Sequence, residues 1–69
     1  MRIYVMQLGG DRREVTIPSG STIQAAAEQA AFGELTGLTP RLNGHPSVMH
    51  AELHEGDRVV FTPKVTGGI

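Results

Sequence analysis

Two adjacent glycines near the end of the chain have the spacing that chemistry at a carboxyl terminus would need. Gly67 and Gly68 follow a segment predicted to be extended, and only Ile69 comes after them. Because glycine lacks a Cβ atom, this backbone could enter a narrow channel and approach a nucleotide phosphate closely. Such an approach would allow activation of a terminal carboxylate as an acyl-adenylate. A frayed chain end is the simpler explanation of the same residues.

Three histidines are the other residues whose types could support chemistry. His50 and His54 are four residues apart, a spacing that places two metal ligands on one face of a helix. The candidates for a third ligand are His45 and Glu55. The segment reads HAELH rather than HExxH, so a glutamate is missing from the position of a metalloprotease base. We therefore expect surface histidines rather than a metal site.

Length and composition limit the classes of protein to which the chain can belong. With 69 residues and no cysteine, we expect one domain with a small aliphatic core, without a disulfide or a thiolate-bound zinc. So short a chain leaves little room for an enclosed pocket, which argues against an enzyme. No apolar run is long enough to cross a membrane and no secretion signal is recognisable, so we expect a cytoplasmic protein.

The charges argue against nucleic acid as a partner. Six Lys and Arg residues stand against seven Asp and Glu residues, which gives a formal net charge of −1. The cations are scattered singly or as the pair Arg12-Arg13, without a basic stripe along the sequence.

Glycine and proline divide the chain into predicted elements. Residues 2–8 and 12–17 have the composition and alternation of strands, and the glycines between them predict a hairpin. Ser21 and Gln24 form a possible capping box at the start of a helix that ends near Gly33. The apolar face of this helix repeats with a period of 3.6 residues at Ile23, Ala26, Ala27 and Ala30.

The second half predicts a short strand pair and a long closing strand. Asn43-Gly44 is the strongest hairpin signal, residues 58–62 have the composition of a strand, and residues 48–55 fit either a short helical turn or a loop. A hairpin, a helix, a strand pair and a closing strand follow one another in the order of an α+β protein of the β-grasp, or ubiquitin-like, class. We expect a mixed sheet of four to five strands packed on one helix, with the last strand parallel to the first. The prediction is a single domain over residues 1–69 with a flexible C-terminal tail at 63–69.

The apolar residues are more numerous than the expected core can hold, so some should form an exposed patch on the outer face of the sheet. The expected core is Ile3, Val5, Val15, Ile17, Ile23, Ala27, Leu42, Leu53, Val59 and Phe61. The surplus residues are Tyr4, Met6, Leu8, Phe32, Leu35, Leu38, Val48, Met49 and Val60.

Three motifs in the second half resemble the small sulfur-carrier proteins of the ThiS and MoaD type. They are Leu42-Asn43-Gly44, then Leu53-x-x-Gly56-Asp57-x-Val59, then Val65-x-Gly67-Gly68. The resemblance implies that an E1-like activating enzyme uses ATP to adenylate the carboxylate of Gly68, which then becomes a thiocarboxylate. It also implies a sulfur-accepting enzyme as a further partner and no cofactor bound by the chain itself. Partner docking would use the surface around the last strand and tail, with Arg58, Lys64 and Val65 as candidates.

Ile69 departs from the pattern of this family, whose chains end at the second glycine. The resemblance implies that a metalloprotease trims Ile69, because some relatives carry one or two extra residues. Alternatively, the chain is a ubiquitin-like interaction module without carboxyl chemistry, or the isoleucine is artificial. A protein modifier that forms an isopeptide bond through Gly68 is a further alternative.

Overall fold

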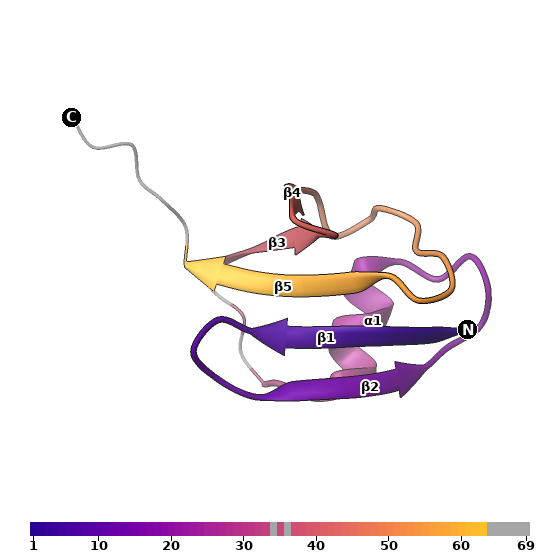
Figure 1. The fold of residues 1–69 in the computed structure, drawn as a ribbon, viewed down its shortest axis with the longest axis horizontal. Coiled ribbons are helices and arrows are strands. Elements are labelled where there is room, and N and C mark those ends of the chain that lie inside the picture. The colour runs from indigo at the N-terminus through magenta and orange to yellow at the C-terminus, as the bar shows by residue number, and fades with distance from the viewer. Residues whose placement is uncertain (34, 36, 64–69) are drawn as a thin grey trace.

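A five-stranded mixed sheet and one helix make up the computed structural model, which describes residues 1–33, 35 and 37–63 (Figure 1). The strands lie side by side in the order β2-β1-β5-β3-β4. The pairs β1·β2, β3·β5 and β3·β4 are antiparallel, whereas β1·β5 is parallel, as expected from the sequence. In chain order the elements are β1 (Arg2–Gln7), β2 (Arg12–Thr16), α1 (Ile23–Ala30), β3 (Leu38–Leu42), β4 (His45–Pro46) and β5 (Arg58–Pro63).

Both predicted hairpins are present. Strands β1 and β2 pair in a register that places Ile3 opposite Val15, and the turn between them includes Gly9 at a φ of 74°. Between β3 and β4, Asn43 and Gly44 have φ values of 50° and 87°, as a two-residue turn of the primed type requires. Asparagine and glycine adopt this left-handed conformation at the lowest cost, so the sequence signal has a direct physical origin.

The helix begins and ends at positions other than the predicted caps. Its N-cap is Thr22, whose hydroxyl accepts a hydrogen bond of 3.3 Å from the N–H of Ala25. The hydroxyl of Ser21 is already used, because it donates to the carbonyl of Pro18 at 2.7 Å. At the other end, Ala31 rather than Gly33 takes the left-handed conformation that stops the helix, with a φ of 56°.

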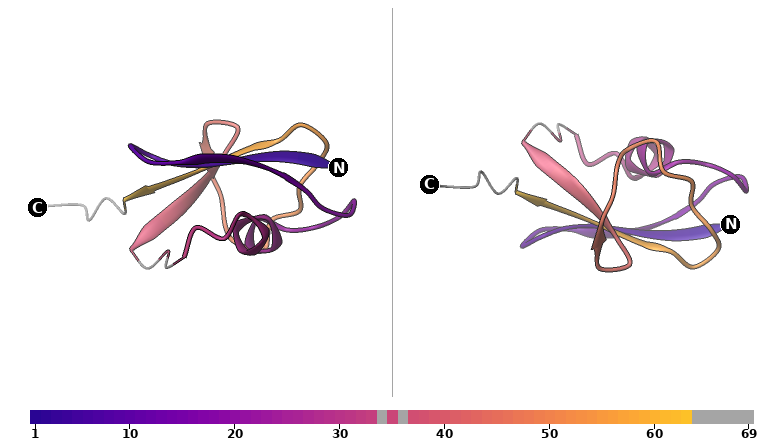
Figure 2. Two further views of the ribbon diagram at one scale, coloured as in Figure 1. Left: turned by 90° about the horizontal axis from the view of Figure 1, so that it is seen from below. Right: turned by 90° about the horizontal axis from the view of Figure 1, so that it is seen from above.

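The helix covers one face of the sheet, and its small side chains bring it close to the strands (Figure 2). All of the expected core residues are buried except Leu42, which is half-buried and packs against the core from β3. Ala26 and Ala30 are buried as well, because the helix presents its whole alanine face to the sheet. The buried apolar residues are Ile3, Val5, Val15, Ile17, Ile23, Ala26, Ala27, Ala30, Leu53, Val59 and Phe61.

Residues 48–55 form a loop, so the structure decides between the two predicted alternatives. The loop is tied to the start of the helix by the N–H of Ile23, which donates to Ala51 at 3.1 Å, and by the N–H of Leu53, which donates to Ser21 at 2.8 Å. The Leu53 side chain is 1% exposed and anchors the loop in the core.

Among the helices of the described residues, none has the length and apolar character needed to cross a membrane.

Shortening the anchor of this loop should destabilise the whole domain. We expect Leu53→Ala to lower the free energy of unfolding by about 2–5 kcal/mol, because it removes buried methyl groups and leaves a cavity. The control is Val48→Ala in the same loop, where the side chain is 51% exposed and the change should stay within about 0.5 kcal/mol. Urea denaturation followed by circular dichroism measures both variants. Equal midpoints for the two would contradict the anchoring role.

Candidate functional site

The central strand β5 supports the segment that the sequence singles out. Hydrogen bonding to β1 on one side and to β3 on the other holds it in place. Its side chains Val59 and Phe61 are 0% and 1% exposed, so the strand is fixed by packing as well. Pro63, which the sequence assigns to the tail, is the last residue of this strand and pairs with Leu38. The strand is paired on both sides as far as Phe61, and its last two residues, Thr62 and Pro63, pair with β3 alone.

The residues predicted to carry carboxyl chemistry or tail docking follow Pro63 and lie outside the described residues. Lys64, Val65, Gly67, Gly68 and Ile69 therefore remain predictions. The remaining docking candidate, Arg58, is the exposed first residue of β5.

Hydrogen bonds between two turns hold the start of β5 in place. The side-chain amide of Asn43 donates to the Asp57 carboxylate at 3.0 Å, and its carbonyl oxygen accepts from the N–H of Arg58 at 2.9 Å. The second oxygen of Asp57 accepts from the N–H of His54 at 2.8 Å. Asn43 and Asp57, which belong to the Asn-Gly and Gly-Asp turns, are 14 residues apart in sequence. The hydrogen bonds that they make join the two turns and fix the start of the strand.

The outer face of the sheet, opposite the helix, carries an apolar centre. Tyr4, Met6 and Val60 lie there in neighbouring positions of β1 and β5, and each is half-buried. The predicted surplus of apolar residues is thus partly on this face. Much of the remainder packs against the core instead, namely Phe32, Leu35, Leu38 and Met49, whereas Leu8 and Val48 are exposed.

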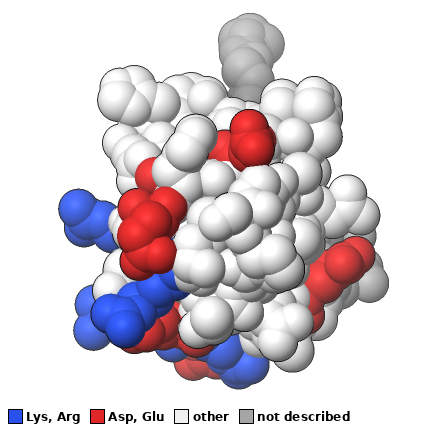
Figure 3. Space-filling view, turned by 90° about the vertical axis from the view of Figure 1, so that its right-hand side faces the viewer, with Lys and Arg blue, Asp and Glu red and all other residues white. Residues whose placement is uncertain are grey.

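Arginines surround this apolar centre. The strand registers place Arg12 beside Met6 on one flank, and Arg41 beside Val60 on the other. Arg58 lies beside Tyr4 on the central strand. In Figure 3 the blue side chains gather at the left and lower left of the molecule, whereas the red carboxylates occur on both sides.

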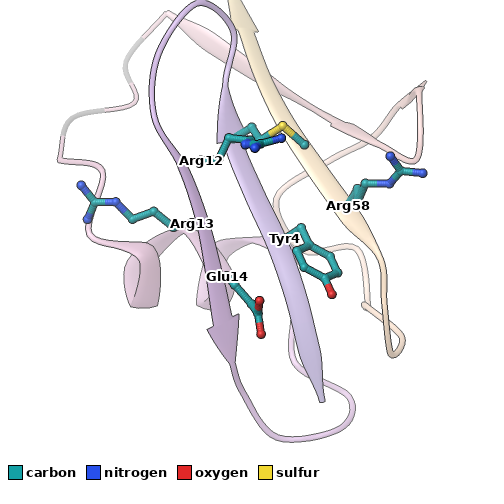
Figure 4. Close-up of a pocket in the computed structure, with 6 residues that line it drawn as sticks. Tyr4, Arg12, Arg13, Glu14 and Arg58 are labelled. Atoms are coloured by element: carbon teal, nitrogen blue, oxygen red, sulfur yellow. The ribbon is translucent and has the colours of Figure 1, made fainter.

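Two open hollows share the residues at the middle of this face. One of about 420 Å³ is lined by Tyr4, Met6, Arg12, Arg13, Glu14 and Arg58. The other, of about 310 Å³, is lined by Met6, Asn43, Gly44, Arg58 and Val60. Figure 4 shows Tyr4 lying between Glu14 and Arg58, with Arg13 extending toward the other side of β2.

Arg13 belongs to the lining of the first hollow, but its guanidinium is bound at the end of the helix. Its guanidinium donates to the carbonyl of Ala30 at 2.7 Å and lies 5.1 Å from the centre of the Phe32 ring. A cation at the C-terminal end of a helix satisfies a free carbonyl and interacts favourably with the helix dipole.

The carboxylate on the outer face is already paired. Glu14 lies 2.9 Å from the guanidinium of Arg2, and both side chains are more than half exposed. Hydrogen bonding with Tyr4, followed by the charge of Glu14, raises the pKa of Arg2 above its ordinary value. Both interactions favour the charged form of a side chain that is protonated in proteins in any case.

The histidines do not have the arrangement that their spacing suggested. His50 and His54 lie in the loop and not on one face of a helix. His54 is instead beside Asp57, with 3.8 Å between its Nδ1 and the carboxylate. Over residues 1–33, 35 and 37–63, no group of three potential ligands is placed to hold a metal ion.

Comparisons with known proteins find the same fold at low sequence identity. The crystal structure of SAMP1 from Haloferax volcanii superposes with a TM-score of 0.75 at 16% identity, covering 99% of this chain and 100% of that one. A proposed molybdopterin converting factor, subunit 1, from Pyrococcus furiosus gives 0.71 at 20% identity, covering 93% of this chain and 98% of that one. The fold is the ubiquitin-like β-grasp. A ubiquitin from Caldiarchaeum subterraneum, with a TM-score of 0.69 at 17% identity, covers 99% of this chain and 98% of its own.

The comparisons confirm the fold class predicted from the order of the elements. No protein-family model matches the chain, and no curated protein matches it in sequence. The likeness therefore lies in the arrangement of strands and helix, and the function has to be argued from this chain's own residues.

Removing the Asp57 carboxylate should loosen the start of β5. We expect Asp57→Ala to lower the free energy of unfolding by about 1–3 kcal/mol, because two donors lose a charged acceptor. Asp57→Asn keeps one acceptor oxygen and should lose less. Urea denaturation measures stability, and amide hydrogen exchange at Arg58 reports the local loosening.

The control for this change is Asp11→Ala, which removes the carboxylate of an aspartate that is exposed, whereas Asp57 is half-buried. The Asp11 carboxylate is 3.6 Å from Arg13, and an exposed pair of this kind contributes about 0–1 kcal/mol. An Asp57→Ala variant as stable as Asp11→Ala, with unchanged amide exchange at Arg58, would contradict the role of Asp57 in holding the start of β5.

Proposed function

We propose that the chain is a ubiquitin-like sulfur carrier whose C-terminal carboxylate, at Gly68 after removal of Ile69, is the reactive group. It is a substrate of other enzymes rather than an enzyme, and ATP is bound by the activating partner. The proposal rests on one observation above the others. The sequence ends Gly67-Gly68-Ile69 only a few residues beyond Pro63, the last residue of a strand held from both sides.

The folded domain and the glycines at the end of the sequence have different roles in this chemistry. The domain gives the activating enzyme a fixed surface to recognise, while glycine backbone without Cβ atoms can be threaded to a nucleotide. The structural likeness to SAMP1 and to the proposed molybdopterin converting factor subunit supports this assignment. So do the turn motifs at Asn43 and Asp57, whose joint purpose in the fold is to fix the start of β5.

The reaction has two steps at the carbonyl carbon of Gly68. A carboxylate oxygen attacks the α-phosphorus of ATP, pyrophosphate leaves, and a mixed anhydride with AMP is formed. A sulfur nucleophile at the sulfide level then attacks the carbonyl carbon and AMP leaves with the electron pair of the broken C–O bond. The product is a thiocarboxylate that a sulfur-accepting enzyme can consume.

Ile69 has to be removed before the first step. The branched side chain of an isoleucine crowds the carboxylate of the same residue. The α-carbon of Gly68 carries no side chain, so its carboxylate is easier to approach. Trimming by a metalloprotease would therefore act as the step that makes the carrier competent.

A protein modifier is the second candidate, supported by the structural likeness to a ubiquitin. The adenylation step would be the same, but the amine of an acceptor lysine would attack the activated carbonyl and form an isopeptide bond. A ubiquitin-like interaction module without any carboxyl chemistry is the remaining alternative.

Intact-mass measurement separates these functions. We expect the chain ending at Gly68, incubated with extract of its own cells, ATP and a sulfide source, to gain ~16 Da as one carboxyl oxygen is replaced by sulfur. The chain with Ile69 should gain this mass only after it has lost the isoleucine. A chain ending at Gly67 is the matched control, because it presents a glycine carboxylate one residue short, and it should stay unmodified.

Other outcomes of the same measurement oppose the carrier function. A ladder of conjugates without thiocarboxylate would identify a modifier. Sulfur gain by the chain that retains Ile69 would contradict trimming. An unmodified Gly68 chain under every condition would leave the interaction module.

A further inference from the structure

Charge on the outer face of the sheet is far more concentrated than the sequence indicates. The outward positions of β1, β2, β3 and β5 carry Arg2, Arg12, Arg41 and Arg58, with Glu14 as the one carboxylate at these positions. Four positive charges and one negative charge give this face a net charge of +3, although the whole chain has −1. Every arginine of the sequence except Arg13 is therefore gathered on one face by the strand registers.

One row across the sheet has a definite chemical pattern. The registers align Arg12 on β2, Met6 on β1, Val60 on β5 and Arg41 on β3. This is a cation, two apolar side chains and a second cation. The Cα atoms of the two arginines are separated by three strand spacings, or about 14 Å. We refer to these four residues as the outer row.

The cations of the outer row are available to a partner. Glu14 is paired with Arg2, and no other ion pair among the described residues involves Arg12, Arg41 or Arg58. Arg41 uses one nitrogen to donate to the carbonyl of Gly44 at 2.8 Å, which orients its guanidinium and leaves its other donors. The hollows on either side of Met6 provide room for a side chain between the cations.

We propose that the outer row docks an acidic segment of a partner protein, in which an apolar side chain lies between two carboxylates. An extended segment directs residues i, i+2 and i+4 to one side, and its first and last Cα atoms are about 13 Å apart. This length matches the separation of the two arginines. The apolar side chain would cover Met6 and Val60, and each carboxylate would receive the paired donors of a guanidinium.

The composition of the face favours a protein over a nucleic acid. A nucleic acid needs a track of cations along its backbone and aromatic rings for its bases. Met6 and Val60 occupy the middle of the row instead, and Tyr4 is the one aromatic residue at an outward position of the described strands. A centre of partly exposed apolar side chains within a charged rim is the usual anatomy of a protein interface.

Docking at this face is independent of the carboxyl chemistry proposed above. The outer row crosses β5 at Val60, three residues before Pro63 and about 10 Å from it along the strand. A partner could therefore hold the face while the residues beyond Pro63 are bound elsewhere. The test below reads contacts on the face alone, so its failure and the failure of carboxyl activation are distinguishable.

The experiment titrates the isotope-labelled full chain with a defined probe and follows its amide resonances. The probe is a synthetic peptide in which Glu, Leu and Glu alternate with Ser, and its counterpart carries Lys in place of both Glu residues. We expect the acidic peptide to shift the resonances of Met6, Arg12, Arg41 and Val60, with an affinity that falls as salt is added. The lysine peptide should leave them unchanged.

Two double variants with equal net charge make the decisive comparison. Arg12→Gln with Arg41→Gln removes both flanks of the row and should weaken the peptide about tenfold or more, as expected for the loss of two charge-assisted contacts. Gln24→Glu with Gln29→Glu changes the net charge equally on exposed positions of α1 and should bind as the unaltered chain does. If the first variant fails to fold, Arg12→Gln with Arg58→Gln tests the same face.

Several results would overturn the proposal. These are equal binding by the lysine peptide, equal weakening by the two double variants, and shifts centred away from the outer row. Tighter binding of single-stranded oligodeoxythymidylate at this face would assign it to nucleic acid, and concentration-dependent self-association would assign it to a second copy. Absence of any shift at millimolar acidic peptide would also refute it.

Discussion

The double-sided pairing of β5 is the constraint on which the rest of the structure depends. Its backbone bonds to β1 in parallel and to β3 antiparallel, while Val59 and Phe61 fill the core on the helix side. A parallel neighbour cannot be reached by a tight turn, so the chain must cross over before it returns beside its own first strand. The helix makes this crossover and covers the core face. The same pairing leaves the outer face open and places the end of the last described strand at one edge of a rigid body.

Rigidity at the two ends of this strand has different origins. At its start, the Asn43 amide and the Asp57 carboxylate lock two turns together through hydrogen bonds at exposed positions. At its end, the strand is held by ladder bonds to β3 that reach Pro63. A small domain without disulfides has few ways to fix a segment firmly. A central position in the sheet does so because both edges of the strand are hydrogen-bonded. The docking proposed for this chain uses the middle of this strand, at Val60, and the proposed carboxyl chemistry uses the residues that follow its end.

Local sequence signals predicted the elements well because each signal has a local cause. Asn43 and Gly44 adopt positive φ at low cost because of their own residue types, and the alternation of apolar side chains in β2 directs Val15 inward. Cap positions were predicted less well. Ser21 and Thr22 are both able to cap a helix, and the choice between them depends on a hydroxyl of Ser21 that bonds to Pro18 instead. Leu42, expected in the core, lies at the rim because β3 is covered by the helix less completely than β1.

The sequence by itself determined the two hairpins, the alanine-faced helix, most of the core and the β-grasp order, since these follow from periodicity and turn chemistry along neighbouring residues. It also placed Gly67-Gly68 after the last strand, which is the basis of the proposed carboxyl chemistry. Only the tertiary structure decided that Asn43 and Asp57 bond to each other and that Arg12 and Arg41 flank one apolar row. The physical reason is that strand registers bring together residues far apart in the chain. Charges that are scattered along a sequence can therefore form a single face in the fold.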